Sequence, residues 1–143
     1  MAQILDGKQV AAQMRAELKL EIDRLKGRGV VPGLGVILVG DDPASVSYVT
    51  GKKRACEEIG IYSEDRRLPG HTSQEELAAL IGRMNADPRI HGILVQLPLP
   101  KPLDASQVLL TLDPAKDVDG IHPLSVGRMV VGQEAFLPCT PHG

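Results

Sequence analysis

The chain has 143 residues, of which 43% are hydrophobic, and its formal net charge is -2. This length and hydrophobic content predict one compact domain with a core of its own. Acidic and basic residues are interspersed, so the sequence lacks the charge pattern of a protein that binds nucleic acid or an anionic membrane.

The amino-terminal part of the chain predicts a helix followed by a buried strand. Apolar residues recur at spacings of three and four over residues 8–26, which indicates an amphipathic helix ended by Gly27 and Gly29. The run LGVILV over residues 34–39 is short, continuous and rich in β-branched residues. This pattern is typical of a strand buried on both faces, as in a parallel sheet.

The next helix carries the first candidate site residues. Asp42 is a typical N-cap for it and Gly60 a typical C-terminal stop. Tyr48 and Lys52 stand four residues apart, and Ser45 lies one turn earlier, so a phenol and an ammonium share one helix face. A lysine that is partly desolvated near the end of a buried strand can give or take a proton near neutral pH. Helices also carry this pair by chance, so these residues alone leave an ordinary surface as the alternative.

Helix and strand continue to alternate in the middle of the chain. Residues 61–68 predict a weaker strand, placed near a sheet edge because of its charges. Ser73 and Glu76 form a capping box for the following helix. Residues 90–96, IHGILVQ, predict a third strand, which runs into the loop LPLPKP, where the prolines hold the backbone in one shape.

The last third of the chain predicts short elements. Asp104 and Gln107 offer a second capping box, for a helix that runs through Leu112. The segment DPAKDVDGIHP is expected to be a polar loop. A short helix over residues 124–131 and an extended piece over residues 135–137 should follow.

This alternation predicts an α/β fold, a three-layer α/β/α domain with a mainly parallel sheet. In such sheets ligands collect outside the carboxyl ends of the strands. Tyr48 and Lys52 follow the end of the first strand, and Gln96 and Pro98 lie at the end of the third. With the loop of residues 117–120 at the same rim, we expect three remote segments to converge on one cleft.

Several familiar motifs match only in part, and their position or spacing in the chain argues against each of them. The glycines between residues 27 and 35 partly match GxGxxG, but they precede the strand that a dinucleotide fingerprint must follow. Short-chain dehydrogenases also carry YxxxK, yet they place it well after an amino-terminal Rossmann fingerprint, for which this chain has no room. Asp117, Asp119 and Gly120 lack the spacing and the closing Glu of an EF-hand. No histidine has a partner at metal-ligand spacing, so we expect no metal site.

The cysteines and the amino-terminal sequence indicate the cellular compartment in which the protein is expected. Cys56 and Cys139 lie far apart and form no CxxC motif, which favours a reduced setting. The start MAQILDGKQV lacks the pattern of a signal peptide, and no apolar run approaches the length of a membrane span. We therefore expect a cytoplasmic protein with no membrane contact.

Four segments together resemble the bifunctional methylenetetrahydrofolate dehydrogenase/cyclohydrolase family. They are VGDDPASVSYVTGKKRACEEIGI, HGILVQLPLP, KDVDGIHP and PCTP, and they stand in the family's order and spacing over nearly the whole chain. The resemblance implies that residues 1–143 are the catalytic domain of a folate enzyme. Such an enzyme oxidises 5,10-methylenetetrahydrofolate with NADP to the methenyl cation and hydrolyses that cation to 10-formyltetrahydrofolate.

The resemblance also implies catalytic roles for four residues. Lys52 would act in proton transfer during hydrolysis, and Gln96 would hydrogen-bond Lys52 and tune it. Tyr48 would pack against the folate and fix its orientation. Asp119 would accept hydrogen bonds from the pterin ring, whose NH donors suit a carboxylate.

The remaining pocket residues follow from the same resemblance. Leu97 and Pro98 would form part of the pocket wall, and Ser45 would line it. Each site residue keeps a structural alternative: Asp119 could cap the helix that follows it, and Gln96 could satisfy a loop amide.

The chain departs from the family pattern after PCTP. There the family continues into a Rossmann domain that binds NADP and then a returning terminal helix, which this sequence does not contain. NADP is therefore expected only in the intact enzyme, as is the homodimer, and Thr140 would either approach the nicotinamide or shape a turn. Ser125 stands where the family commonly has Asn. The alternatives are a folate-binding domain without catalysis and a flavodoxin-like regulatory domain, in which Gln96 and Asp119 would have no obvious purpose.

Overall fold

The computed structural model describes residues 6–139, in which helices and strands alternate as predicted. The elements are α1 (Gly7–Gly27), β1 (Gly33–Val39), α2 (Pro43–Ile59), β2 (Tyr62–Leu68), α3 (Gln74–Ala86), β3 (Gly92–Val95), α4 (Ala105–Thr111), the 3-10 helix η1 (Pro114–Lys116) and α5 (Pro123–Val130). No helix in this range is long and apolar enough to cross a membrane.

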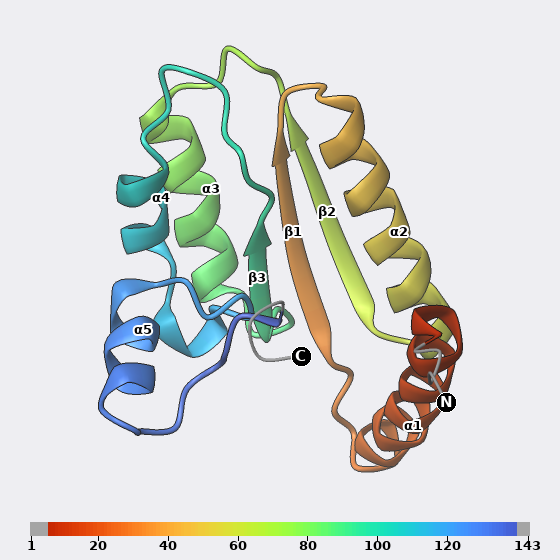
Figure 1. Cartoon of the computed structure of the whole chain (residues 1–143). Coiled ribbons are helices and arrows are strands. Elements are labelled where there is room, and N and C mark those ends of the chain that lie inside the picture. The colour runs from red at the N-terminus through yellow and green to blue at the C-terminus, as the bar shows by residue number, and fades with distance from the viewer. Residues whose placement is uncertain (1–5, 140–143) are drawn as a thin grey trace, which may run out of the picture.

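The three strands form one parallel sheet in the order β2-β1-β3. Strand β1 is central and almost entirely buried, whereas the charged strand β2 lies at an edge, as predicted. Helices α1 and α2 lie on one side of the sheet, and α3 and α4 lie on the other (Figure 1). The predicted three-layer α/β/α fold is therefore confirmed.

The core is aliphatic and lies between the sheet and the layer of α3 and α4. Its buried members are Ile37, Val39, Leu77, Leu80, Ile81, Met84, Ile90, Ile93, Val95, Val108 and Leu112. Each such side chain contributes about 1.5–3 kcal/mol by leaving water. The core therefore fixes the strands, and with them the positions at which the strands end.

The predicted caps of the two long middle helices are present. The Asp42 carboxylate accepts a hydrogen bond from the Ser45 amide at 2.8 Å and begins α2. Gly60 ends that helix in a left-handed conformation, with φ of 86°, which a glycine adopts without steric cost. Ser73 and Glu76 form the reciprocal capping box of α3, with distances of 3.1 and 2.9 Å.

Three predictions need correction. Strand β3 is shorter than residues 90–96, and the loop before α5 contains the helix η1. Asp104 caps α4 through the amides of Ser106 and Gln107, but the amide of Asp104 donates to Gln74 Oε1 at 3.0 Å, so a tertiary contact replaces the second half of the predicted capping box. Residues 135–137 belong to no helix and to no strand of the sheet, and their predicted extended conformation stays a prediction.

Candidate functional site

A hollow of about 320 Å³ lies at the carboxyl end of β3. Its walls come from α2, from β3 and the loop after it, from the loop before α5 and from the C-terminal segment. The lining residues are Lys52, Leu94, Val95, Gln96, Leu97, Asp119, Ile121, Pro138 and Cys139. The predicted convergence of an amine, an amide and an acid from three remote segments is therefore confirmed.

Lys52 and Gln96 are hydrogen-bonded to each other across this hollow. Lys52 Nζ donates to Gln96 Oε1 at 2.9 Å, and Gln96 Nε2 donates to the carbonyl oxygen of Leu97 at 2.8 Å. The backbone amide of Gln96 donates to the Ile37 carbonyl at 2.9 Å, which ties the residue to the end of β1. The predicted hydrogen bond is confirmed, and the side-chain amide is held so that its oxygen faces the amine.

Among the described residues, Lys52 forms no ion pair. It lies half-buried, with the neutral amide of Gln96 as its hydrogen-bond partner. No salt bridge among the described residues therefore fixes the position of the amine. The amine is oriented, yet it is available for chemistry.

Asp119 faces the same hollow and is half-buried. Burial raises the pKa of its carboxyl group, the charge of Lys52 lowers it, and the negative charge of Asp117 raises it again, with a net rise above 3.8. Asp119 therefore takes up a proton more readily than a surface aspartate does. A carboxyl group in this setting can hydrogen-bond a ligand that carries several N–H donors.

The loop that carries Asp119 is anchored on both sides. Before it, Lys116 Nζ donates to three carbonyl oxygens at the end of α3, those of Met84, Asn85 and Asp87, at 3.2, 2.7 and 3.0 Å. After it, Gly120 has a positive φ of 65°, and a Cβ there would lie 2.3 Å from the Phe136 carbonyl oxygen. A glycine is therefore required where the C-terminal segment crosses the loop.

Comparison with known proteins gives this site its context. Residues 5–119 match the family described as tetrahydrofolate dehydrogenase/cyclohydrolase, catalytic domain. The chain belongs to this family.

Relatives of this domain are closely similar along its whole length. The bifunctional protein FolD of Halalkalibacterium halodurans is 60% identical over 142 residues, and that of Geotalea uraniireducens is 52% identical over 143 residues. These matches cover 99% and 100% of this chain but 51% of each relative. The chain thus spans about half the length of the curated relatives it matches.

Solved structures agree with the fold of the domain. The bifunctional enzyme FolD from Campylobacter jejuni superposes with a TM-score of 0.95 at 48% identity, over 98% of this chain and 50% of that one. The methylenetetrahydrofolate dehydrogenase-cyclohydrolase of Trypanosoma brucei, solved with NADP and an inhibitor, gives 0.94 at 34% identity, over 99% and 49%.

Three predicted folate-site residues do not line the hollow. Tyr48 is 64% exposed, and it lies one turn before Lys52 on α2. Ser45 is buried in the first turn of that helix, and Pro98 is exposed after a cis peptide bond with Leu97. Their roles at the site stay predictions, and Thr140 lies outside the described residues.

Several lining residues were not predicted from the sequence. Val95 and Ile121 are ordinary apolar residues, so nothing in their pattern marks them as part of a site. Cys139 brings an exposed thiol to the hollow from the C-terminal segment, although the sequence marks it only as an isolated cysteine. No group of three or more His, Cys, Asp or Glu side chains within residues 6–139 is placed to hold a metal ion.

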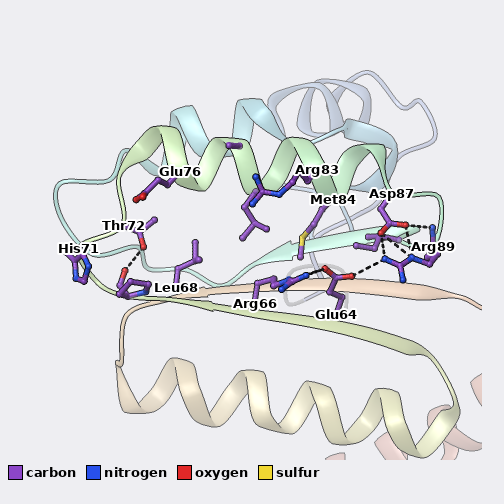
Figure 2. Close-up of a pocket in the computed structure, with 14 residues that line it drawn as sticks. Glu64, Arg66, Leu68, His71, Thr72, Glu76, Arg83, Met84, Asp87 and Arg89 are labelled. Carbon is purple, nitrogen blue, oxygen red and sulfur yellow. Dashed lines mark hydrogen bonds and ion pairs between the residues drawn. The ribbon is translucent and has the colours of Figure 1, made fainter.

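A larger groove of about 740 Å³ lies elsewhere in this domain, between β2 and α3. Figure 2 shows that its charged side chains are paired at one end, with Glu64 contacting Arg66 and Arg89, and Asp87 contacting Arg89. None of the predicted site residues lines this groove. Because its acids already have basic partners, this end of the groove offers a ligand little unpaired charge.

Proposed function

We propose that this chain is the folate-binding catalytic half of a bifunctional methylenetetrahydrofolate dehydrogenase/cyclohydrolase. The observation that carries the proposal is the hydrogen bond between Lys52 and Gln96 in a hollow that also contains Asp119. The family gives the reaction class, and these residue types suit it. Asp119 provides an acceptor for the N–H groups of a pterin. The amine of Lys52 then lies where the one-carbon group next to that ring would react.

The hydrolysis of the methenyl cation needs positioning and proton transfer. A water oxygen bonds to the methenyl carbon, while Lys52 relays one proton of that water to solvent. The adduct then loses its hydroxyl proton as the carbon–oxygen double bond forms. The bond from that carbon to N5 breaks, and N5 takes a proton, which yields 10-formyltetrahydrofolate. Gln96 keeps the amine aimed at the reacting carbon through these steps.

The other predicted contacts complete the folate site in this proposal. The exposed ring of Tyr48 is free to pack against the folate, one turn from Lys52. Leu97 forms part of the wall, as its place in the lining supports. Pro98 continues that wall, and Ser45 supports the first turn of α2 beneath Tyr48.

The described residues do not fit a binding site for NADP. A dinucleotide site needs a free helix N-terminus after a strand, where amides bind phosphate. Here each of the three such helices is capped by its own side chains, those of Asp42, Ser73 with Glu76, and Asp104. Oxidation of the folate by NADP therefore belongs to the intact enzyme, with the cofactor bound outside residues 6–139, and this chain alone performs no hydride transfer.

The intact enzyme in this proposal is a cytoplasmic homodimer. One feature of this chain that accords with further contacts is an apolar stripe on α1, formed by Val10, Met14 and Leu18, which are 52%, 56% and 49% exposed. Exposed apolar stripes of this kind are typical of surfaces that another part of a protein covers. Sedimentation equilibrium of the intact enzyme measures its state directly.

The test of the function uses the full-length enzyme with Lys52→Met. We expect this variant to bind folate but to lose hydrolysis of methenyltetrahydrofolate, followed as the loss of that compound's absorbance. Hydrolysis at the wild-type rate in the variant would remove Lys52 from the mechanism. If the wild-type enzyme bound folate without any turnover, the chain would instead be a non-catalytic folate-binding domain.

A further inference from the structure

Asp117 is a buried carboxylate that the proposed chemistry does not use. Its exposed fraction is 0%, and one of its oxygens, Oδ1, has no hydrogen-bond partner among the described residues. The other oxygen, Oδ2, accepts from the His122 amide and from Ser125 Oγ, both at 2.8 Å. No basic side chain pairs with it among residues 6–139. A buried carboxylate with so few partners is costly to keep inside a protein, so its position calls for an explanation.

None of the residues that contact Asp117 lines the hollow. Its backbone forms an isolated parallel bridge with Ile93 on β3. Its carboxylate joins the start of the loop to His122, the N-cap of α5, and to Ser125 in the first turn of that helix. Its carbonyl oxygen accepts from the Gly120 amide at 3.3 Å. Asp117 alone therefore links the two ends of the segment from residue 117 to residue 122 through its hydrogen bonds.

Asp119 lies in the middle of this closed segment. Val118, between the two aspartates, packs on the sheet so closely that a Cβ on Gly92 would lie 2.3 Å from its Cγ1. With Asp117 held by β3 and α5 and Val118 held by β3, the next side chain is the one that reaches the hollow. The position of Asp119 thus depends on the contacts made two residues earlier.

We propose that Asp117 is a positioning residue that fixes Asp119 for recognition of the folate ring. The inference rests on the proposed function, because Asp119 has a ligand to recognise only if the hollow binds folate. A carboxylate at position 117 satisfies two donors with one oxygen, which joins strand, loop and helix at one point. Loss of that oxygen frees the loop, and a displacement of about 1 Å at a recognition group can cost up to about a hundredfold in rate.

The central experiment is a double-mutant cycle in the full-length enzyme. Asp117→Ala removes the shared acceptor, and Asp119→Asn removes the recognition charge. We expect each substitution to raise the KM for 5,10-methylenetetrahydrofolate about tenfold or more, with the KM for NADP unchanged. Because Asp117 acts through Asp119, the double variant should lose little more than the worse single variant. Purely structural damage by Asp117→Ala would instead multiply with the effect of Asp119→Asn.

Asp117→Asn provides a second readout, since asparagine keeps an oxygen that can accept from His122 and Ser125 but lacks the charge. That charge raises the pKa of Asp119, so the variant should move the acidic limb of folate binding to lower pH. The other titratable groups at the hollow are Lys52 from α2 and Cys139 from the C-terminal segment, and the substitution leaves both in place. An acidic limb that stays where it is would show that the charge of Asp117 does not act on Asp119.

The control is Thr72→Val, which removes a buried hydroxyl that donates to the Pro69 carbonyl oxygen at 2.7 Å, away from the hollow. It should lower the Tm without changing the KM for folate. If Asp117→Ala fails to fold, the cycle is run with Ser125→Ala, which removes one of the two donors.

The two hypotheses fail in different ways. A wild-type enzyme that does not turn over folate would refute the proposed function itself. An active wild type whose Asp117→Ala variant keeps its folate KM, or shows full additivity with Asp119→Asn, would overturn the positioning role alone.

Discussion

Replacement of Gln96 by leucine tests the part of the site on which the proposed hydrolysis depends. Leucine has a similar size but offers no acceptor, so the substitution removes the 2.9 Å hydrogen bond from Lys52 Nζ and the 2.8 Å bond to the Leu97 carbonyl oxygen. A hydrogen bond to a charged group contributes about 1.5–3 kcal/mol. If that energy orients Lys52 in the transition state, its loss corresponds to about a tenfold to hundredfold fall in rate.

The assay is hydrolysis of methenyltetrahydrofolate by the full-length enzyme, with kcat and KM determined separately. The fall should appear mainly in kcat, because in the proposed mechanism Gln96 orients the amine and Asp119 recognises the ring. The matched control is Gln74→Leu, which removes the contacts of a glutamine with the backbone of Asp104 outside the hollow. Equal kcat values for the two variants would refute the reasoning that Gln96 orients Lys52.

Three further predictions concern stability. Because burial raises the pKa of Asp119, the folded chain binds the proton of this carboxyl group more tightly than the unfolded chain does. The ionised carboxylate therefore destabilises the fold, and this effect is complete only above the raised pKa. Asp119→Asn should raise the Tm at pH 7, by an amount that shrinks as the pH falls toward 3.8. Lys116→Met removes three carbonyl contacts and should cost about 1.5–3 kcal/mol in urea unfolding, whereas the exposed Lys19→Met should cost almost nothing. Leu77→Ala, at a position with 0% exposure, should cost about 2–5 kcal/mol, against a much smaller loss for Leu110→Ala at 60% exposure.

The fold could be predicted because its signals are local and repeated. The continuous apolar run that became β1, the charges of β2 and the caps at Asp42 and Ser73 each specify one element without reference to the rest of the chain. The second capping box failed because Gln74, thirty residues earlier, satisfies the amide of Asp104. Sequence spacing cannot reveal such a partner.

The site was predictable only where the topology determines it. Lys52 and Gln96 both follow strand ends, so a parallel sheet brings them together. The supporting residues were not predictable, because Lys116 and Asp117 have the composition of a solvated loop and act through buried contacts with α3, β3 and α5. Hydrophobic periodicity carries no information on polar side chains that are buried by tertiary structure.

The 116–125 segment separates support from recognition. The side chains of Lys116, Asp117 and Ser125 make hydrogen bonds outside the hollow, and of these four side chains only that of Asp119 lines it. In the proposed site, an inhibitor that binds Asp119 therefore meets a carboxylate whose loop is held by hydrogen bonds to α3 and α5. Compounds whose donors match that fixed geometry should be favoured strongly over close analogues with displaced donors, because the protein has little freedom to adapt to them.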